Sequence, residues 1–456
     1  MTDAFERALA AVRDRVNPDP EERRTLGAAA DRLAERAREA VASLPVDADV
    51  VQVGSTARNT WVSGDRDIDL FVRFDSTLDR TDLETYGLEV GHAVLPDGHE
   101  EYAEHPYVKG TFEGYDVDLV PCYAVESAAD IRSAVDRTPF HTAYLESRID
   151  DELADEVRLA KGFLKGIGVY GSDLKTRGFS GYLTELLVVE YGGFRAFVEA
   201  VADWRPPVEL DPADHGTETF DAPLSVVDPT DPERNVAAVV DAENVARLQH
   251  YARELLADPR EELFVRDDPA PLEAAGVREH LRQRGTAPLA LRFSMPELVS
   301  DQLYPQLRRS REGLIRGLDD AGFDPLRSAA WATRSESEEG WTCVLLVELA
   351  HDTLPVIERH EGPPVSASEH ARGFYEGYAD GPAYGPFLDG GRYVVERERE
   401  LRTPAEFLDA RLFEVALGAH VETALESGYD ALTGEGIAEL ADRFGEELRR
   451  YFEPRP

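Results

Sequence analysis

The segment VGSTARNTWVSGDRDIDL, residues 53–70, carries the pattern that decides the fold. A Gly-Ser pair, Gly54 and Ser55, follows a short apolar run, and a gap of eleven residues separates it from Asp67 and Asp69 in a strand-like stretch. Side chains at alternate positions of a strand point to the same face. Two neighbouring carboxylates repel each other unless a cation lies between them, and oxygen ligands suit Mg²⁺. The pattern therefore favours a cation site over the alternative, a surface strand with two solvated acids.

A third carboxylate is expected in YDVDLVPCY, residues 115–123, if the site holds two metal ions. Asp118 has apolar neighbours on both sides, in the same kind of apolar stretch as the Asp67–Asp69 pair. Asp116 would share its face in a regular strand, so the pattern does not force the choice between them. Asp118 is favoured because it lies deeper in the apolar run. The alternative is an edge strand with solvated acids.

The Gly-Ser pair has a chemical role beside these acids. Glycine lets the backbone approach a ligand closely, and the Ser55 hydroxyl with the turn amides can cradle a triphosphate. Arg58 adds a positive group three residues further on. The chain lacks the GxxxxGK[ST] pattern, so this is not a P-loop.

The charge composition indicates the salt concentration to which the protein is adapted, rather than the kind of partner that it binds. The formal net charge is −41, with 90 acidic residues, and only four of the 49 basic residues are lysine. Acidic residues are spread along the whole chain and lysine is almost absent, which indicates adaptation to molar salt. The Debye length there falls to about 3 Å, so long-range repulsion of a polyanion is largely screened. Local basic contacts can still bind phosphate, although counterion release then favours binding less.

The remaining composition predicts a cytoplasmic protein without a membrane span. Cys122 and Cys343 lie far apart and indicate neither a disulfide framework nor a thiolate metal site. The first fifteen residues carry charges throughout and lack the apolar core of a signal peptide. No run approaches the roughly eighteen apolar residues of a transmembrane helix.

The order of elements predicts a multidomain α+β protein in three parts. An amphipathic helix over 20–43 and strands over 49–53, 67–74 and 115–120 predict an α/β catalytic head, residues 1–150. A helical central domain follows at 151–265, its last helical stretch covering 233–258. Residues 266–456 alternate and predict an α+β body and tail. Its strands are expected at 290–296, 341–350 and 391–400, and its helices at 303–321 and 404–427.

The Gly-Ser pair, the two strand acids and the later strand acid together resemble the nucleotidyltransferases of the DNA polymerase beta superfamily. Further blocks sharpen the resemblance to the archaeal class I CCA-adding enzymes, which are tRNA nucleotidyltransferases. These blocks are GSTARNTW (54–61), AEHPYVKG (103–110), VDLVPCY (117–123), SAVDRTPFH (133–141), VRLAKGF (157–163), GVYGSDLKTRGFSGYLTELLV (168–188) and GPPV (362–365). Several blocks in order over more than 130 residues are specific, whereas the first element alone indicates only the superfamily.

The resemblance implies roles for particular residues. It implies that Asp67, Asp69 and Asp118 form a catalytic site holding two Mg²⁺ ions. It also implies that Arg234 lies near the base of the incoming nucleotide, with Glu104 as a further candidate there. It also implies triphosphate and sugar contacts from Ser55, Arg58, Thr138, His141, Lys161 and Tyr170. One position departs from the family, which often has Glu where this chain has Asp67. Because Asp keeps the charge, the departure does not indicate an inactive enzyme.

The lysines and the C-terminal part give further candidates. All four lysines, at 109, 161, 165 and 175, lie in or beside the quoted blocks. Lys161 and Lys165 are one helical turn apart and could both face phosphates; Lys165 and Lys175 could equally lie on the helix surface or contact the tRNA backbone. The aromatic run 373–387 could stack on bases or pack as a loop. A predicted helix carries arginines that could touch RNA or pair with acids: Arg308, Arg309, Arg311 and Arg316.

The function implied by the resemblance is addition or repair of the 3′-terminal CCA of tRNA from CTP and ATP. One rival is another polymerizing nucleotidyltransferase, such as a poly(A) polymerase or an oligoadenylate synthase. A second is a non-catalytic RNA-binding protein on an inactive transferase fold, which the complete acid set disfavours. The expected partners are tRNA, CTP and ATP; the oligomeric state is left open, with a homodimer as one option.

Overall fold

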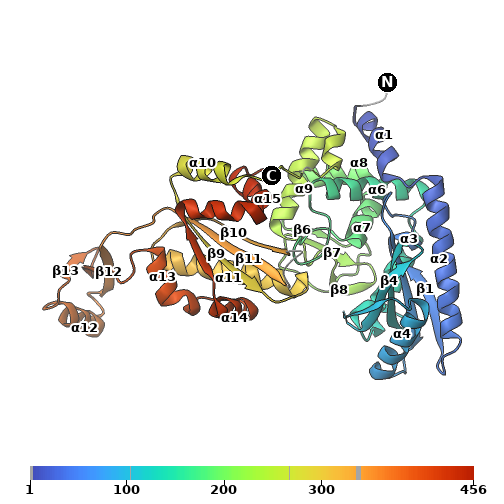
Figure 1. Cartoon of the computed structure of the whole chain (residues 1–456), viewed down its shortest axis with the longest axis horizontal. Helices are drawn as coiled ribbons and strands as arrows, with labels where there is room; N and C mark the ends of the chain where they lie inside the picture. Colours follow the sequence, from blue (N-terminus) through green and yellow to red (C-terminus); the bar gives the residue numbers. More distant parts are fainter. Residues whose placement is uncertain (1–3, 103, 267, 335–339) are drawn as a thin grey trace. The chain divides into compact units, whose positions relative to one another are not determined.

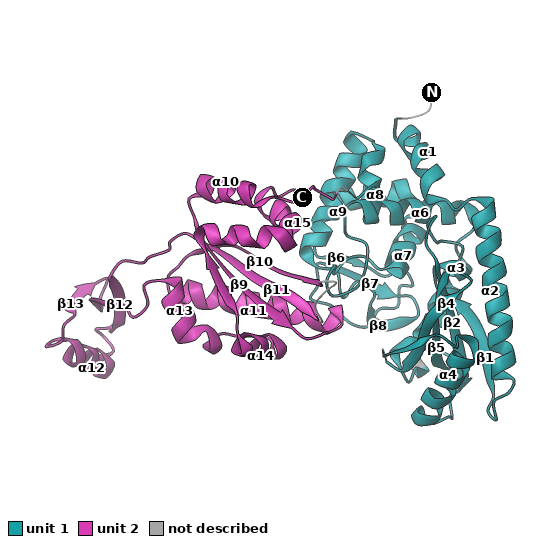
Figure 2. Ribbon diagram, viewed as in Figure 1, with its two compact units in different colours: residues 1–267, 456 teal, residues 268–455 magenta. Residues whose placement is uncertain are grey.

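The computed structural model describes residues 4–102, 104–266, 268–334 and 340–456. The chain forms two compact units, one of residues 1–267 with 456 and one of residues 268–455 (Figure 2). No helix in these described ranges is long and apolar enough to cross a membrane. The fold is α+β and multidomain, as the sequence predicts.

A five-stranded mixed sheet forms the head of the first unit (Figure 1). Its order is β1 (Ala48–Val53), β2 (Asp67–Asp75), β5 (Tyr115–Ala124), β4 (Pro106–Phe112) and β3 (His99–Tyr102). Strands β2 and β5 run parallel, and the other neighbours are antiparallel. The three strands expected at 49–53, 67–74 and 115–120 are confirmed, and β3 and β4 join them.

Helices α2 (Pro20–Val41) and α4 (Arg80–Val94) supply the apolar partners of this sheet. The helix expected at 20–43 is confirmed, and Asp19 caps it by accepting the backbone N–H groups of Glu21 and Glu22. The alternate β2 residues Ile68, Leu70, Val72 and Phe74 share one buried core with both helices. The intervening β2 positions, Asp67 and Asp69 among them, therefore lie on the opposite face of the sheet.

The helical part of the first unit has a separate core. It contains α6 (Asp151–Gly166), α7 (Gly181–Tyr191), α8 (Phe194–Asp203) and α9 (Ala242–Ala257). Helix α1 (Ala4–Val16) belongs to this core through Phe5, Leu9, Val12 and Val16. The apolar stripe of α1 is therefore buried among the central helices, although α1 lies within the residue range 1–150 expected for the head. The three-part boundaries at 150 and 265 stay predictions.

One stretch of the central domain is not helical as expected. Residues 233–241 enter strand β8 (Asp231–Asn235) and a turn, and α9 begins only after Asp241. The Asp241 carboxylate accepts the Asn244 backbone N–H and so fixes the helix start there. Strand β8 pairs with β7 (Leu224–Asp228), which pairs with β6 (Val208–Leu210). Arg234 therefore lies on a strand.

The second unit is built on a four-stranded antiparallel sheet. Its order is β10 (Pro325–Arg334), β11 (Trp341–Leu349), β9 (Ala287–Met295) and β15 (Asp430–Thr433). One face is packed by α11 (Ser300–Asp320), α13 (Pro404–Arg411) and α14 (Ala419–Ser427). The other is packed by α10 (Ala274–Arg284) and α15 (Ala441–Phe452). The strands expected at 290–296 and 341–350 and the helix at 303–321 are confirmed, whereas 404–427 divides into two helices.

A smaller three-stranded sheet completes this unit, with β12 (Ile357–Pro364), β14 (Arg392–Glu398) and β13 (Tyr384–Asp389) in that order, and β14 confirms the strand expected at 391–400. The aromatic run 373–387 is not a loop, because it covers much of α12 (Ser368–Tyr378) and β13. Phe374 and Tyr378 pack on each other with ring centroids 4.8 Å apart. Tyr375 and Tyr384 are exposed, so the run contains both packed rings and rings open to a partner.

Candidate active site

The carboxylates expected at the catalytic centre lie on neighbouring parallel strands. The register of β2 and β5 places Asp69 opposite Asp118 and Asp67 opposite Asp116. All four acids lie on the face of the sheet opposite the α2 and α4 core, because paired residues of adjacent strands share a face. The strand pairing, which the sequence pattern did not supply, thus brings Asp67, Asp69 and Asp118 to one surface.

Gly54 fits against this surface closely. It begins the short helix α3 (Gly54–Ala57) directly after β1, at a φ of +75° that L side chains rarely adopt. A Cβ placed on Gly54 would lie 2.0 Å from Oδ2 of Asp69. Strand β1 pairs with β2 so that Val53 faces Asp69. The glycine of the Gly-Ser pair is therefore required both by the backbone and by the carboxylate beside it.

The carboxylates destabilise one another's charge. Burial, followed by the charges of Asp118 and Asp67, raises the pKa of Asp69 to about 6. Burial also raises the pKa of Asp118, against the opposing effect of Lys109, whose Nζ lies 3.4 Å from the Asp118 Oδ1. No three Asp, Glu, His or Cys side chains converge on a ready-made metal site within the described ranges. The Lys109 ammonium supplies positive charge at Asp118.

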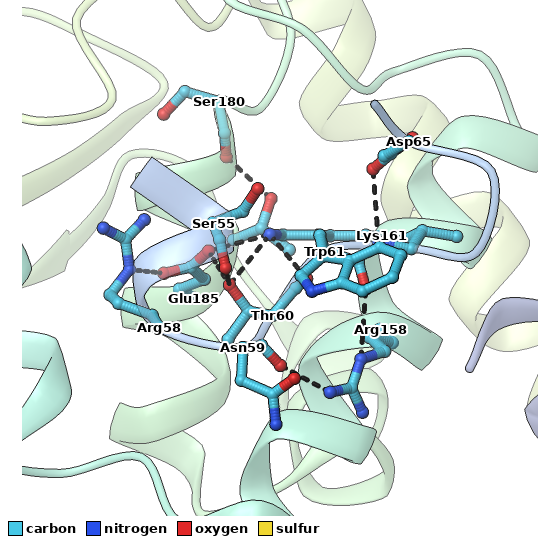
Figure 3. Close-up of polar contacts among 12 residues, drawn as sticks. Ser55, Arg58, Asn59, Thr60, Trp61, Asp65, Arg158, Lys161, Ser180 and Glu185 are labelled. Atoms are coloured by element: carbon cyan, nitrogen blue, oxygen red, sulfur yellow. Dashed lines mark hydrogen bonds and ion pairs between the residues drawn. The ribbon is translucent and has the colours of Figure 1, made fainter. Parts of the chain in front are cut away.

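A buried ion cluster stands beside the Gly-Ser turn (Figure 3). Glu185 on α7 accepts hydrogen bonds from Arg58 Nε at 2.6 Å and from Lys161 Nζ at 2.7 Å. Arg58 Nη1 also donates to the Thr142 hydroxyl at 3.1 Å. Lys161 is only 2% exposed, so its ammonium faces Glu185 rather than open solvent. The expected phosphate role of Lys161 stays a prediction, in a setting the sequence did not indicate.

A second buried carboxylate joins His141 and Arg234. Asp228, at the end of β7, accepts from His141 Nε2 and from Arg234 Nη1, each at 2.7 Å. The hydroxyl and the backbone N–H of Thr230 donate to its other oxygen. These contacts hold the pKa of Asp228 well below its usual range although burial opposes them. His141 and Arg234, which are expected to contact different parts of the nucleotide, are thus both held by the Asp228 carboxylate.

The other expected contacts are spread around these clusters. Ser55 lies on α3, and Thr138 is the first residue of α5 (Thr138–Glu146), the helix that also carries His141. The Tyr170 hydroxyl lies beside Gly181, the first residue of α7: a Cβ on Gly181 would lie 3.1 Å from it. Glu104 lies in the turn between β3 and β4, where its carbonyl accepts from Arg80 Nη2. Their contacts with substrate stay predictions.

Comparison with known proteins assigns the chain to a family. Three family models match successive segments: a nucleotidyltransferase domain at residues 34–141, the second domain of tRNA nucleotidyltransferase at 155–265, and the C-terminal domain of the CCA-adding enzyme at 284–434. The CCA-adding enzyme of Haloarcula marismortui is 60% identical over 466 residues, covering 100% of both chains. The chain belongs to the CCA-adding enzyme family.

Other CCA-adding enzymes support the same assignment at two distances. The enzyme of Halobacterium salinarum is 61% identical over 459 residues and covers 100% of both chains. The enzyme of Methanosarcina barkeri is 39% identical over 438 residues and covers 95% of each. The chain is thus a tRNA nucleotidyltransferase, and halophilic archaea are among the sources of its relatives.

Several site features of this CCA-adding enzyme escaped the sequence reasoning. Glu185 is the only acid between Gly181 and Val189, and a lone charge in an apolar helix is a signal that could have found it. Asp228 ends a fully buried strand, which is a similar signal. Lys165, grouped with Lys161 for phosphate, instead pairs with Asp65, with Nζ 2.9 Å from Oδ1. The four arginines singled out between 308 and 316 lie on α11.

Replacing Asp228 tests its anchoring role. Asp228→Asn removes the charge that His141 and Arg234 share, so we expect kcat/KM for CTP and ATP to fall about 20-fold, mainly through KM. The matched control is Thr230→Val, which removes one hydrogen bond to the same carboxylate and is expected to stay within about threefold. Steady-state kinetics on trimmed tRNA measures both. An Asp228→Asn variant that is folded and has an unchanged KM would contradict the anchoring role.

Proposed function

We propose that this chain adds or repairs the 3′-terminal CCA of tRNA from CTP and ATP without a nucleic-acid template. The tRNA 3′-hydroxyl attacks the α-phosphate of the nucleotide, and pyrophosphate leaves. The observation that carries the proposal is the alignment of Asp67, Asp69 and Asp118 on parallel strands, with Gly54 held against Asp69. The family assignment supplies the tRNA substrate.

The carboxylate set suits two Mg²⁺ ions. Asp67, Asp69 and Asp118 offer hard oxygen donors on one face, and burial together with the charges of neighbouring acids raises the pKa of each, as expected of acids that bind a cation. Bound Mg²⁺ would lower the pKa of the attacking hydroxyl and neutralise charge on the triphosphate. The match to a nucleotidyltransferase domain supports a dependence of the reaction on Mg²⁺.

The protein's own residues contribute positioning and electrostatics. Arg58 and His141 orient the phosphates, and Lys161 adds positive charge from within its ion pair with Glu185. Ser55, Thr138 and Tyr170 contact the triphosphate and sugar. Arg234, held by Asp228, faces the base. Glu104 is a further contact to the base. The helical domain and the second unit bind the acceptor region of tRNA by its A-form shape.

The decisive experiment supplies tRNA that lacks its CCA end, together with CTP, ATP and Mg²⁺ in molar KCl. The expected result is ordered addition of C, C and A, followed by a stop, measured on sequencing gels. With CTP alone, addition should stop after two residues. A long A tract, or extension with ATP alone, would instead indicate a poly(A) polymerase or a related transferase.

A further inference from the structure

Glu185 is a completely buried acid in the first unit whose donors come from separate segments. Its side chain is 0% exposed and accepts from Arg58 after α3, from Thr60 in the following loop, and from Lys161 on α6. The Thr60 hydroxyl donates at 2.7 Å. Lys161 Nζ also donates to the Thr60 carbonyl at 2.9 Å. The four residues therefore form one closed network (Figure 3).

The network contains one carboxylate and two basic side chains. Burial alone would raise the pKa of Glu185, but Lys161 and Arg58 lower it to about 2, so the carboxylate is ionised at neutral pH. This carboxylate faces Arg58 and Lys161; burial lowers the pKa of Lys161, and the Glu185 charge opposes that effect.

The geometry restricts Arg58 more than a single ion pair would. Nε is fixed by Glu185 and Nη1 by Thr142, so the guanidinium plane is held from two helices, α7 and α5. Its side chain is only 7% exposed. Among the described residues, neither these hydrogen bonds nor the ion pair with Glu185 engages Nη2. A guanidinium held on two sides can present its remaining N–H groups in one direction only.

We propose that Glu185 is a positioning residue for nucleotidyl transfer, which fixes Arg58 and Lys161 in the geometry that the transition state requires. The proposal rests on the proposed function, because it concerns the triphosphate site of that reaction. Glu185 does not touch the nucleotide; it acts through the two cations. Its removal therefore leaves both basic side chains in place but releases them from the positions that the carboxylate fixes.

Glu185→Gln separates alignment from attraction. The substitution keeps the shape and raises the net positive charge of the cluster, so inorganic tripolyphosphate should inhibit the variant with a constant within about threefold of wild type. We expect kcat at saturating CTP to fall about 100-fold, with little change in KM. Glu185→Asp keeps the negative charge but has a shorter side chain, and its kcat should lie between those of wild type and Glu185→Gln.

Two further variants keep the test interpretable. Glu348→Gln alters another buried glutamate, 1% exposed and bonded to Arg284, and controls for the cost of removing a buried charge. It should lower the thermal midpoint without changing kcat per folded enzyme. Thr60→Val removes the hydroxyl from the network by a milder change. We expect it to lower kcat about fivefold. This variant therefore tests the positioning role even if Glu185→Gln does not fold.

The outcomes distinguish the two proposals. A folded Glu185→Gln enzyme whose kcat stays within threefold of wild type overturns the positioning role, whether or not its KM rises. An equal loss of kcat in Glu348→Gln also overturns it, because the effect would then be general destabilisation. A wild-type enzyme that adds no C or A to trimmed tRNA would instead refute the proposed function.

Discussion

Asp69→Asn is expected to reduce nucleotide addition by at least about a thousandfold, which corresponds to ~4 kcal/mol of activation free energy. Asp69 faces Asp118 across two parallel strands and is the carboxylate against which Gly54 is packed. An amide of the same shape cannot supply the negative charge that holds the cations. Binding of tRNA should stay within about threefold, because phosphate contacts elsewhere dominate it. Single-turnover addition and filter binding measure the two effects.

Asp116→Asn is the matched control for this experiment. Asp116 lies on the same strand and face as Asp118 and opposite Asp67, but it is exposed, whereas Asp118 is partly buried. We expect Asp116→Asn to stay within about threefold of wild type and Asp118→Asn to lose as much as Asp69→Asn. Equal losses in Asp116→Asn and Asp118→Asn would show that the third carboxylate is wrongly chosen. Undiminished turnover in Asp69→Asn would show that the catalytic site lies elsewhere.

The local part of this site was predictable because it depends on strand alternation. In the β2 stretch of residues 67–74, every second residue is apolar and buried, so the face of Asp67 and Asp69 follows from the sequence. The pairing of Asp69 with Asp118 did not follow, because strand register is a contact between distant segments. Strands β3 and β4 were missed because their polar residues give no apolar alternation.

The buried anchors show a second limit of sequence reasoning. His141, Lys161 and Arg234 were singled out from motifs in the sequence, but the buried acids that they contact were not. Glu185 lies 24 residues from Lys161, and Asp228 lies 87 residues from His141 on a strand that the sequence did not indicate. Whether a lysine faces solvent or a buried acid depends on helix packing. The apolar stripe of α1 likewise did not indicate which core would bury it.

Gly54→Ala is expected to lower kcat about 100-fold while the protein stays folded. The new Cβ would lie 2.0 Å from Oδ2 of Asp69, so the carboxylate must turn away from its position. A displacement of about 1 Å at a catalytic group can cost a factor of about 100. The backbone adds its own cost of about 1–2 kcal/mol, because φ at this position is +75°.

Gly64→Ala separates these two costs. Gly64 has a φ of +86°, so an alanine there suffers the same kind of backbone strain, but no described atom lies within 4 Å of the position its Cβ would take. Both variants should therefore lose similar amounts of thermal stability, measured as the unfolding midpoint at fixed salt. Only Gly54→Ala should lose nucleotide addition. If Gly64→Ala is equally inactive, strain in the loop explains the loss; if both are active, the close approach of Gly54 to Asp69 does not matter for catalysis.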